Sequence, residues 1–356
     1  MPGFVSVLLG ILLFSILIFV HELGHFLAAK AFGVQVNEFS MFMGPAIFKK
    51  KVGETLYSIR CIPIGGFCAM EGEDQDTDNP RSFQKAAWWK RLIILVAGAA
   101  MNFLIGIVFF AIFFIPAQNV GMPVITEFAD CCTFHHEQGL QLGDEIVEID
   151  GERVYTASNI SLLLSLNETG THDIVVLRDG ERLRFDDLPM AHTHQTEDGQ
   201  EYQHYGIGMA GQKATFGLKL KTIWYTTLDN VRSVRLSLQM LLSGKVGLAD
   251  MAGPVGIVDM MSDVAVTAPS WQDALLSLIY FGGFLAINLG VMNLLPIPAL
   301  DGGRVVALVI TTAVEAVTKK KIDPKYEGYI HAAAMILLLA LMAVIMFKDI
   351  FTIFKG

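Results

Sequence analysis

Four long stretches without charged side chains constrain this chain more than any other feature of its sequence. Residues 1–20 carry no charge, and after His21 and Glu22 the apolar run continues to Ala29. The other stretches run from Leu92 to beyond Pro116, between Asp273 and Asp301, and from about Tyr329 to Phe347. A membrane-spanning helix requires about 20 predominantly apolar residues. We therefore predict a polytopic α-helical membrane protein with four transmembrane helices. The first stretch lacks a basic start and a small-residue cleavage site, so we expect a retained helix and not a signal peptide.

The composition supports this class and excludes several others. Only 17% of the 356 residues are charged, against about 25% in soluble globular proteins. Mean hydropathy is +0.49. These values argue against a soluble enzyme or a disordered tail, and four cysteines are too few for a disulfide scaffold. A formal net charge of −9 argues against a nucleic-acid partner.

The distribution of basic residues predicts the orientation in the membrane. The segment from Lys30 to Arg91 holds nine Lys and Arg residues, and the short segment after the third apolar stretch holds four lysines between Lys319 and Lys325. Loops rich in Lys and Arg stay on the cytoplasmic side. Both termini are then outside the cytoplasm. So is the segment 117–271, which contains ten basic and twenty-one acidic residues.

The first polar cluster inside an apolar stretch is His21-Glu22-Leu23-Gly24-His25. Ionisable residues within a span are costly and usually functional. Residues four apart share a helix face, so both imidazoles can bind one metal ion. Glu22 can then act as a general base at the open position of that ion. The alternative is a polar helix-packing face without a metal.

Asp301 is the best candidate for a third ligand. A catalytic zinc usually has three protein ligands and an open fourth position. The predicted topology places Asp301 towards the cytoplasmic end of the third apolar stretch, at the level of the two histidines. Pro296 and Pro298 interrupt the backbone before it, and such a break is tolerated at membrane depth only where it lines a cavity or is packed by protein. The alternative is that Asp301 caps a helix at the cytoplasmic face.

Together, the HExxH motif on the first span and Asn293-Leu294-Leu295-Pro296 followed by Leu300-Asp301-Gly302 resemble the site-2 proteases, which are intramembrane zinc metalloproteases. The bacterial RseP/RasP branch is most similar, and the resemblance covers nearly the whole chain. It implies one Zn2+ per chain and a place in the bacterial inner membrane. It also implies substrates that are single-pass membrane proteins already shortened outside, such as anti-sigma factors or remnant signal peptides. Shorter matches to the branch are Gly44-Pro45, Pro63-Ile64-Gly65-Gly66-Phe67, Ala97-Gly98 with Asn102-Phe103, and Gly253-Pro254-Val255.

Residues 54–73 read as a strand over 54–60, a tight turn at Gly65-Gly66, and a second strand over 67–70. The resemblance implies that this hairpin dips into the membrane beside the zinc. A free strand edge can bind an extended substrate through ladder hydrogen bonds. The candidate substrate-binding residues here are Gly65, Gly66, Phe67, Cys68, Ala69 and Met70. The alternative is an ordinary cytoplasmic hairpin that contacts no substrate.

Three amides lie in apolar helices. For Asn102 we expect a helix–helix hydrogen bond, the usual role of such a residue. For Asn288 and Asn293 the family pattern implies contacts to the substrate backbone, and Pro298 is assigned with them. Either amide can alternatively help to polarise the scissile carbonyl.

The segment outside the cytoplasm predicts a folded domain. Glu145 to Ile149 alternates apolar and charged residues as a half-buried strand does, and Asp150-Gly151 supplies a turn. A helix over 158–166, capped by Ser158, and strands over 173–177 and 182–185 follow. This pattern resembles one bacterial PDZ domain over 119–211, where the RseP branch often has two. It either binds a peptide and filters substrates, or it is a folded cap without a ligand.

The remaining features receive simpler interpretations. Apolar residues recur at helical spacing from Leu218 to Leu242, which predicts an amphipathic helix that lies in the membrane interface or packs on the PDZ domain. We expect surface histidines at 135, 136, 172, 192, 194 and 204, with a second metal site as the alternative. At Cys131-Cys132 we expect free thiols, with a vicinal disulfide as the alternative. Cys61 and Cys68 lack a zinc-like spacing.

The predicted function is hydrolysis of a peptide bond within a transmembrane segment, with zinc held by His21, His25 and Asp301 and with Glu22 as the base. A non-catalytic PDZ-containing membrane scaffold that binds exported peptides is the alternative. A metal transporter ranks last, because the third apolar stretch offers no ionisable ligands along a path. The predicted segments are a first span (1–30), a cytoplasmic-side loop with the membrane-associated β-hairpin (31–90), a second span (91–118), the PDZ domain (119–211), an amphipathic membrane-associated linker (212–271), a third span (272–318), a cytoplasmic loop (319–328) and a fourth span (329–353).

Overall fold

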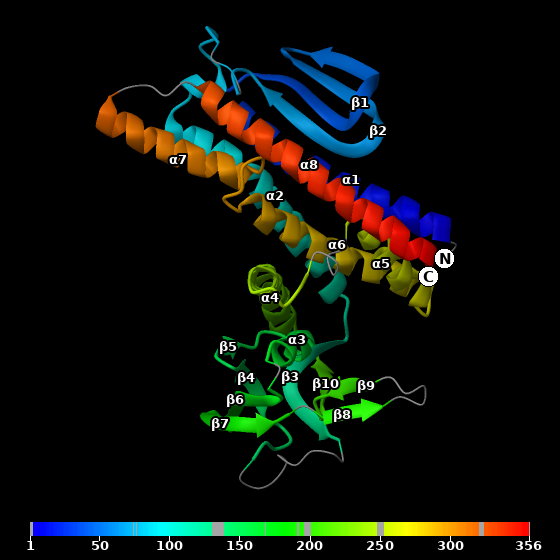
Figure 1. The fold of residues 1–356 in the computed structure, drawn as a ribbon. Coiled ribbons are helices and arrows are strands. Elements are labelled where there is room, and N and C mark those ends of the chain that lie inside the picture. The colour runs from blue at the N-terminus through cyan, green and yellow to red at the C-terminus, as the bar shows by residue number, and fades with distance from the viewer. Residues whose placement is uncertain are drawn as a thin grey trace. The chain divides into compact units, whose positions relative to one another are not determined.

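A computed structural model describes residues 3–73, 75, 77–129, 139–167, 169–190, 192–195, 201–247, 253–319 and 324–355. The chain divides into two compact units (Figure 1). The first combines residues 1–110 and 233–356, and the second is formed by residues 111–232. Each unit is described by itself. The predicted Cys131-Cys132 pair and the histidines at 135 and 136 lie outside the described residues.

Among the described residues, four helices are long and apolar enough to cross a membrane, in agreement with the four predicted spans. They are α1 (Gly3–Ala31), α2 (Trp88–Phe114), α6 (Trp271–Asn293) and α8 (Pro324–Lys355). The third span was predicted too long. It ends at Asn293, and a separate helix, α7 (Asp301–Thr318), begins after a connection of seven residues. Pro296 and Pro298 in the connection lack the N–H groups that a continuous helix requires.

The predicted hairpin within 54–70 is wrong, because a strand that was not predicted separates its two halves. β1 (Val36–Val52) and β2 (Thr55–Met70) form an antiparallel sheet. The tight turn joins β1 to β2 at Gly53-Glu54, where Val52 faces Thr55. Further along, Glu38 of β1 pairs with Leu56 on one side and with Ala69 on the other. The segment around Gly65-Gly66 therefore carries β2 across β1 and does not form a tight hairpin turn.

Because β1 also bends, between residues 41 and 46, the two long strands form four rows of backbone side by side. Residues 46–52 pair with 55–60, residues 55–59 pair with 38–41, and residues 38–41 pair with 66–70. Residues 66–70 are thus an edge of the sheet. A short 3-10 helix, η1 (Phe83–Lys85), follows before α2. The buried core of this region joins α1, the sheet, α2 and α7 through Ala29, Val36, Phe39, Cys68, Met70, Ile94, Leu95 and Leu308.

The predicted linker over 212–271 contains a second helix that belongs to the core of the first unit. α5 (Pro254–Thr267) packs against α1 and α6. Its Met261 is fully buried and lies in one apolar cluster with Leu278 of α6. Polar backbone groups at the start of α5 are bound by α8, because Asp349 Oδ2 accepts hydrogen bonds from the N–H groups of Gly253 and Gly256 at 2.8 and 3.0 Å.

The second unit is a small β-rich domain. Its main sheet has the order β10-β3-β4-β6-β7, with β5 paired to β4 (Figure 1). The strand predicted at Glu145–Ile149 is confirmed, and the two later strands are confirmed but longer. The bounds are β3 (Asn119–Phe128), β4 (Glu145–Ile149), β5 (Glu152–Arg153), β6 (Thr171–Arg178), β7 (Glu181–Pro189) and β10 (Ile207–Lys213), with a separate pair β8 (His192–Gln195) and β9 (Glu201–His204).

Two details of this unit differ from the prediction. The helix begins later than predicted, because η2 (Ala157–Asn159) precedes α3 (Ile160–Ser165) and Ser158 does not cap it. His172, predicted at the surface, is buried, and its Nδ1 lies 2.7 Å from a carboxylate oxygen of Asp150. His172 lies on the same inward face of β6 as Ile174 and Val176, which explains its burial.

The predicted amphipathic helix is confirmed as α4 (Phe216–Leu242). Its buried Asp229 accepts hydrogen bonds from Thr156 and Asn159 and pairs with Arg232 on the next turn. Because a buried carboxylate is costly unless it is hydrogen-bonded, these three donors explain how the charge is tolerated. The network joins α4 to the segment around α3 within the second unit.

Candidate metal centre

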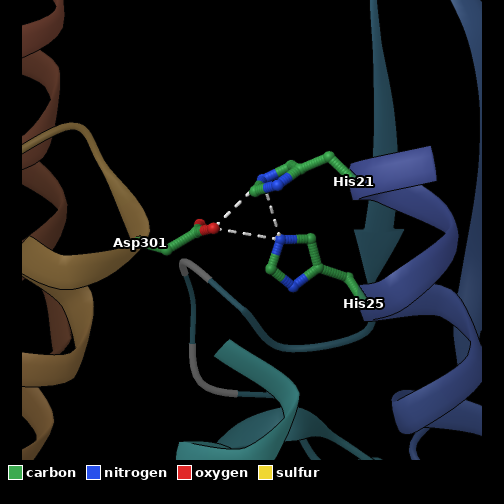
Figure 2. A group of neighbouring side chains, drawn as sticks. All are labelled: His21, His25 and Asp301. Atoms are coloured by element: carbon green, nitrogen blue, oxygen red, sulfur yellow. Dashed lines mark hydrogen bonds and ion pairs between the residues drawn. The ribbon is translucent and has the colours of Figure 1, made fainter. Parts of the chain in front are cut away.

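Three side chains from two distant parts of the chain converge at one point in the first unit. His21 and His25 extend from consecutive turns of α1, and Asp301 approaches from the first residue of α7 (Figure 2). The Nε2 atoms of the two imidazoles lie 3.3 Å apart. Oδ2 of Asp301 lies 3.1 Å from Nε2 of His21 and 3.2 Å from Nε2 of His25. The structure therefore brings together the three side chains that the sequence predicted as ligands.

These three atoms fit a zinc ion. Ligands about 2.0–2.1 Å from the centre of a tetrahedron lie about 3.3 Å from one another, close to the three observed separations. All three residues are largely buried, and Oδ2 of Asp301 has no hydrogen bond of ordinary geometry within the described part of the chain. Two imidazole nitrogens and a carboxylate oxygen are also the atom types that zinc prefers.

The second ring nitrogen of each histidine is held by a neighbour on α2. His25 Nδ1 lies 2.8 Å from the carbonyl oxygen of Ile94, which requires an N–H at Nδ1 and leaves the lone pair on Nε2. His21 Nδ1 lies 3.2 Å from the side-chain amide of the fully buried Asn102. Such outer contacts set the tautomer and ring orientation of metal-binding histidines. The helix–helix contact predicted for Asn102 is therefore made to His21.

α2 can lie this close to the two histidines because Gly98 has no side chain. A Cβ atom at Gly98 would lie 2.7 Å from Cε1 of His25 and 2.8 Å from Cε1 of His21. Ordinary carbon–carbon contacts are about 3.5–4.0 Å. Gly98 is thus part of the wall of the metal centre, although the sequence alone indicated only a short match at Ala97-Gly98.

Glu22 faces a cavity of about 600 Å3 that also reaches His25 and Asp301. Its carboxylate hydrogen-bonds to none of the described residues, so it is available to water. The edge residues of β2, including Phe67, Cys68, Ala69 and Met70, line the same cavity. Gly66 lets β2 lie close to β1, since a Cβ there would lie 3.0 Å from the Ser40 carbonyl, and this position also lies beside α1, 3.6 Å from Cγ of Glu22.

The other predicted residues lie at different distances from the centre. Asn293 is close, with its amide nitrogen 3.4 Å from both ring nitrogens of His21. Asn288 instead donates its amide to the carbonyl of Phe284 in its own helix at 2.7 Å. Gly65 lies at the bend of β2 with a φ of +82°, and Pro298 lies in the loop before Asp301. Burial raises the pKa of the Cys68 thiol, so it stays protonated and is a poor metal ligand.

Two features near the centre were missed by the sequence reasoning. His331 of α8 accepts a hydrogen bond from the backbone N–H of Ala299, two residues before Asp301. Arg304, one turn after Asp301, forms an ion pair with Glu73 at the end of the cavity. A signal for His331 existed, because an ionisable residue within a predicted span is a candidate for function.

Comparisons with known proteins find matches that cover nearly the whole chain. The model of peptidase family M50 matches residues 9–341. A Clostridium acetobutylicum protein, whose name assigns it provisionally to the zinc metalloproteases, is 33% identical over 98% of this chain and 98% of its own. The regulator of sigma-W protease RasP of Bacillus subtilis is 28% identical over 98% of this chain and 99% of its own. The zinc metalloprotease RasP of Geobacillus kaustophilus is 28% identical over 97% of each chain.

The family match includes both motifs that supply the three converging side chains. It also includes all or most of each of the four helices that can cross a membrane. The chain therefore belongs to peptidase family M50 and is a zinc metalloprotease of the site-2 type.

Proposed function

We propose that this protein hydrolyses a peptide bond within the transmembrane segment of a single-pass membrane protein. The observation that carries this proposal is the convergence of His21, His25 and Asp301, with ligand atoms 3.1–3.3 Å apart. Two of these residues belong to α1, which is itself long and apolar enough to span a membrane. A peptide bond that reaches this centre therefore lies at or near membrane depth.

In this proposal His21, His25 and Asp301 hold one zinc ion. Zinc in such a site lowers the pKa of bound water from 15.7 to about 7 and so supplies hydroxide near neutral pH. The bond from His25 Nδ1 to the carbonyl of Ile94 keeps the Nε2 lone pair of His25 directed at the centre. At His21 the same tautomer requires that Asn102 presents its amide oxygen, which has no other partner among the described residues, to Nδ1. Glu22, in the adjoining cavity, takes a proton from the attacking water and passes it to the leaving amine.

The exposed edge of β2 is the proposed binding place for the substrate. Residues 66–70 pair with β1 on one side, and on the other side they pair with no strand among the described residues. A transmembrane helix hides its peptide bonds, so the substrate must be extended before water can attack one. An extended segment added to this edge gains ladder hydrogen bonds and lies beside Glu22. Asn293 then contacts the substrate backbone or its scissile carbonyl, while Asn288 and Pro298 have weaker support.

The orientation follows from the basic residues. Nine Lys and Arg residues between Lys30 and Arg91, and the lysines from Lys319 to Lys325, favour the cytoplasmic side. The metal centre then lies towards the cytoplasm of a bacterial inner membrane, and both termini and the second unit lie outside. The β-rich second unit serves as a single PDZ domain that binds peptides at a sheet edge or caps the protease. The proposed substrates are anti-sigma factors or remnant signal peptides, and a relative that is named a regulator of sigma-W protease favours the anti-sigma factors.

The helix α4 is proposed to lie in the membrane interface. Lys219 Nζ donates a hydrogen bond to the carbonyl of Ile115, just beyond the end of the α2 span, at 2.5 Å. Phe216, Leu220 and Trp224 are spaced four residues apart and are all exposed. Residues at this spacing share one helix face, and an exposed face with Trp is typical of interfacial helices.

The test measures zinc and cleavage together on purified full-length protein. We expect about one zinc per chain in the wild type and none in His21→Ala or Asp301→Ala. Glu22→Gln should keep its zinc, because Glu22 is not a ligand, and should fail to cleave a single-pass model substrate carrying a tag at each end. A Glu22→Gln variant as active as the wild type would refute the assigned base. A wild type without stoichiometric zinc would favour the non-catalytic scaffold.

A further inference from the structure

The loop that connects α6 to α7 leads directly to the predicted ligand Asp301. A side chain of another helix, His331 of α8, accepts a hydrogen bond from this loop. We propose that His331 of α8 is a positioning residue that keeps this loop, and hence Asp301, in the geometry that binds zinc. The inference rests on the proposed zinc-binding role of Asp301 and extends it to the fourth span.

The backbone N–H groups between residues 294 and 300 all have hydrogen-bond acceptors. Leu294 and Leu295 donate to carbonyls at the end of α6, Ile297 donates to Leu295, and Leu300 donates to Ile297. The two prolines have no N–H to donate. The remaining N–H group, that of Ala299, donates to Nδ1 of His331 at 2.9 Å. Every donor of the loop is therefore satisfied, and only Ala299 uses a partner from another element.

These hydrogen bonds are important because the loop lies among apolar helices. Irregular backbone at membrane depth is tolerated only where protein or a water-filled cavity satisfies its polar groups. In this loop, His331 satisfies the N–H group of Ala299. Leu294 to Leu300 is also packed tightly against α7: a Cβ at Gly303 would lie 2.8 Å from the carbonyl carbon of Ile297 and 2.9 Å from Cα of Pro298.

Ala299, within this loop, has an unusual backbone conformation. Its φ is +81°, a left-handed value that residues with a side chain rarely adopt. A conformation of this kind persists only where the surrounding structure holds it. Ala299 lines the same cavity as Glu22, His25 and Asp301, so the strained residue lies within the site. The bond from its N–H to His331 is the contact that opposes relaxation towards negative φ.

α8 has little buried surface along most of its length. From Gly328 to Lys348 every residue of this helix is at least partly exposed, so apolar packing alone defines its position poorly. A polar side chain in such a span is costly unless it has a partner. The bond between His331 and Ala299 thus gives α8 a directional contact to the loop that carries the predicted ligand.

The consequence is an effect of His331 on zinc affinity without contact to zinc. If the bond is lost, Ala299 can relax and Asp301 no longer starts α7 at the same place relative to the two histidines. Outer groups that orient ligands typically change metal affinity by about 10–100-fold when removed. We expect a loss of about tenfold at His331, the low end, because it acts through the loop backbone and not on a ligand atom.

The experiment compares acceptors at different positions on the same side chain, using full-length purified protein. His331→Leu removes the acceptor, His331→Asn keeps one near the position of Nδ1, and His331→Gln places one near the position of Nε2. Tyr329→Leu is the matched control, since Tyr329 is exposed on the same helix. Zinc affinity is measured by competition with a chelator, and thermal unfolding of the zinc-free protein is measured in parallel.

We expect His331→Leu and His331→Gln to lose about tenfold in zinc affinity, while His331→Asn and Tyr329→Leu stay near the wild type. Equal affinity in all variants would overturn the inference. So would a lower unfolding temperature of zinc-free His331→Leu with unchanged zinc affinity, which is the signature of a merely structural role. A wild type that binds no zinc would instead overturn the proposed function, so the two failures are distinguishable.

Discussion

Replacing Gly98 with alanine tests the geometry of the metal centre directly. The added Cβ would lie 2.7 Å from Cε1 of His25 and 2.8 Å from Cε1 of His21. Nε2 of His25, the predicted ligand atom, would be closer still. Ordinary contacts are about 3.5–4.0 Å, so one or both rings must move by about 1 Å. His25 cannot move freely, because its Nδ1 is bonded to the carbonyl of Ile94 at 2.8 Å.

A displacement of this size is large for a metal site. Ligand geometry has to be held within about 0.5 Å, and errors near 1 Å can cost about 100-fold in function. We therefore expect Gly98→Ala to weaken zinc binding about 100-fold, equivalent to about 2.7 kcal/mol. Helix propensity acts in the opposite direction, since Ala is favoured over Gly by about 0.8–1.0 kcal/mol in a helix. Zinc affinity should thus fall without a matching loss of helix stability.

The assay is chelator competition for zinc, with thermal unfolding of the zinc-free protein as the stability measurement. Gly328→Ala is the control, because a Cβ at this position of α8 meets no atom within 4 Å. It should bind zinc like the wild type. The reasoning would be refuted if Gly98→Ala bound zinc within about twofold of the wild type, since the two rings would then have room that the structure does not show.

Two further predictions concern the turn between β1 and β2 and the surroundings of the metal centre. Hydrogen bonds from Arg81, and then from Lys30, hold the pKa of Glu54 well below its ordinary value, at about 2. This low pKa stabilises the folded protein fully above the usual carboxyl pKa near 4.3, and the stabilisation is lost as the pH falls through about 2. At neutral pH Glu54→Gln should therefore unfold at a lower temperature than the wild type. The difference in unfolding temperature should shrink on acidification. Asn102→Leu removes the amide beside Nδ1 of His21 and should weaken zinc binding about 10–100-fold in the same chelator assay. Asn288→Leu, which removes an amide bonded within its own helix, should not, and an equal loss in both would contradict the role of Asn102.

Features that depend on neighbours in the sequence could be predicted without a structure. Four apolar stretches sufficed for four spans, because hydropathy and helix length are local quantities. His21 and His25 share a helix face at any i, i+4 spacing, so their cooperation needed no knowledge of the fold. Glu145–Ile149 and the helix from 216 to 242 were recognised for the same reason, since each shows the period of its own secondary structure.

Features that depend on distant pairing were not predictable in this way. Nothing local indicates that β1 separates the two halves of β2, because strand register is decided by partners and by packing on α1. α5 was taken for a linker, since its apolar residues find their partners only on α1 and α6. Asp301 was inferred from a predicted topology, but the distances that make it a candidate ligand exist only in the folded chain.

The sequence alone therefore determined the membrane class, the number of spans and the chemical identity of the metal centre, because these depend on residue type and short-range spacing. Tertiary structure alone decided what shapes that centre. It placed Gly98 against both imidazoles, turned Asn102 to His21, left Asn288 on its own helix, and bound the loop of Asp301 to His331. The physical reason is that contacts between helices arise from close packing and directional hydrogen bonds between segments that the sequence separates by up to hundreds of residues.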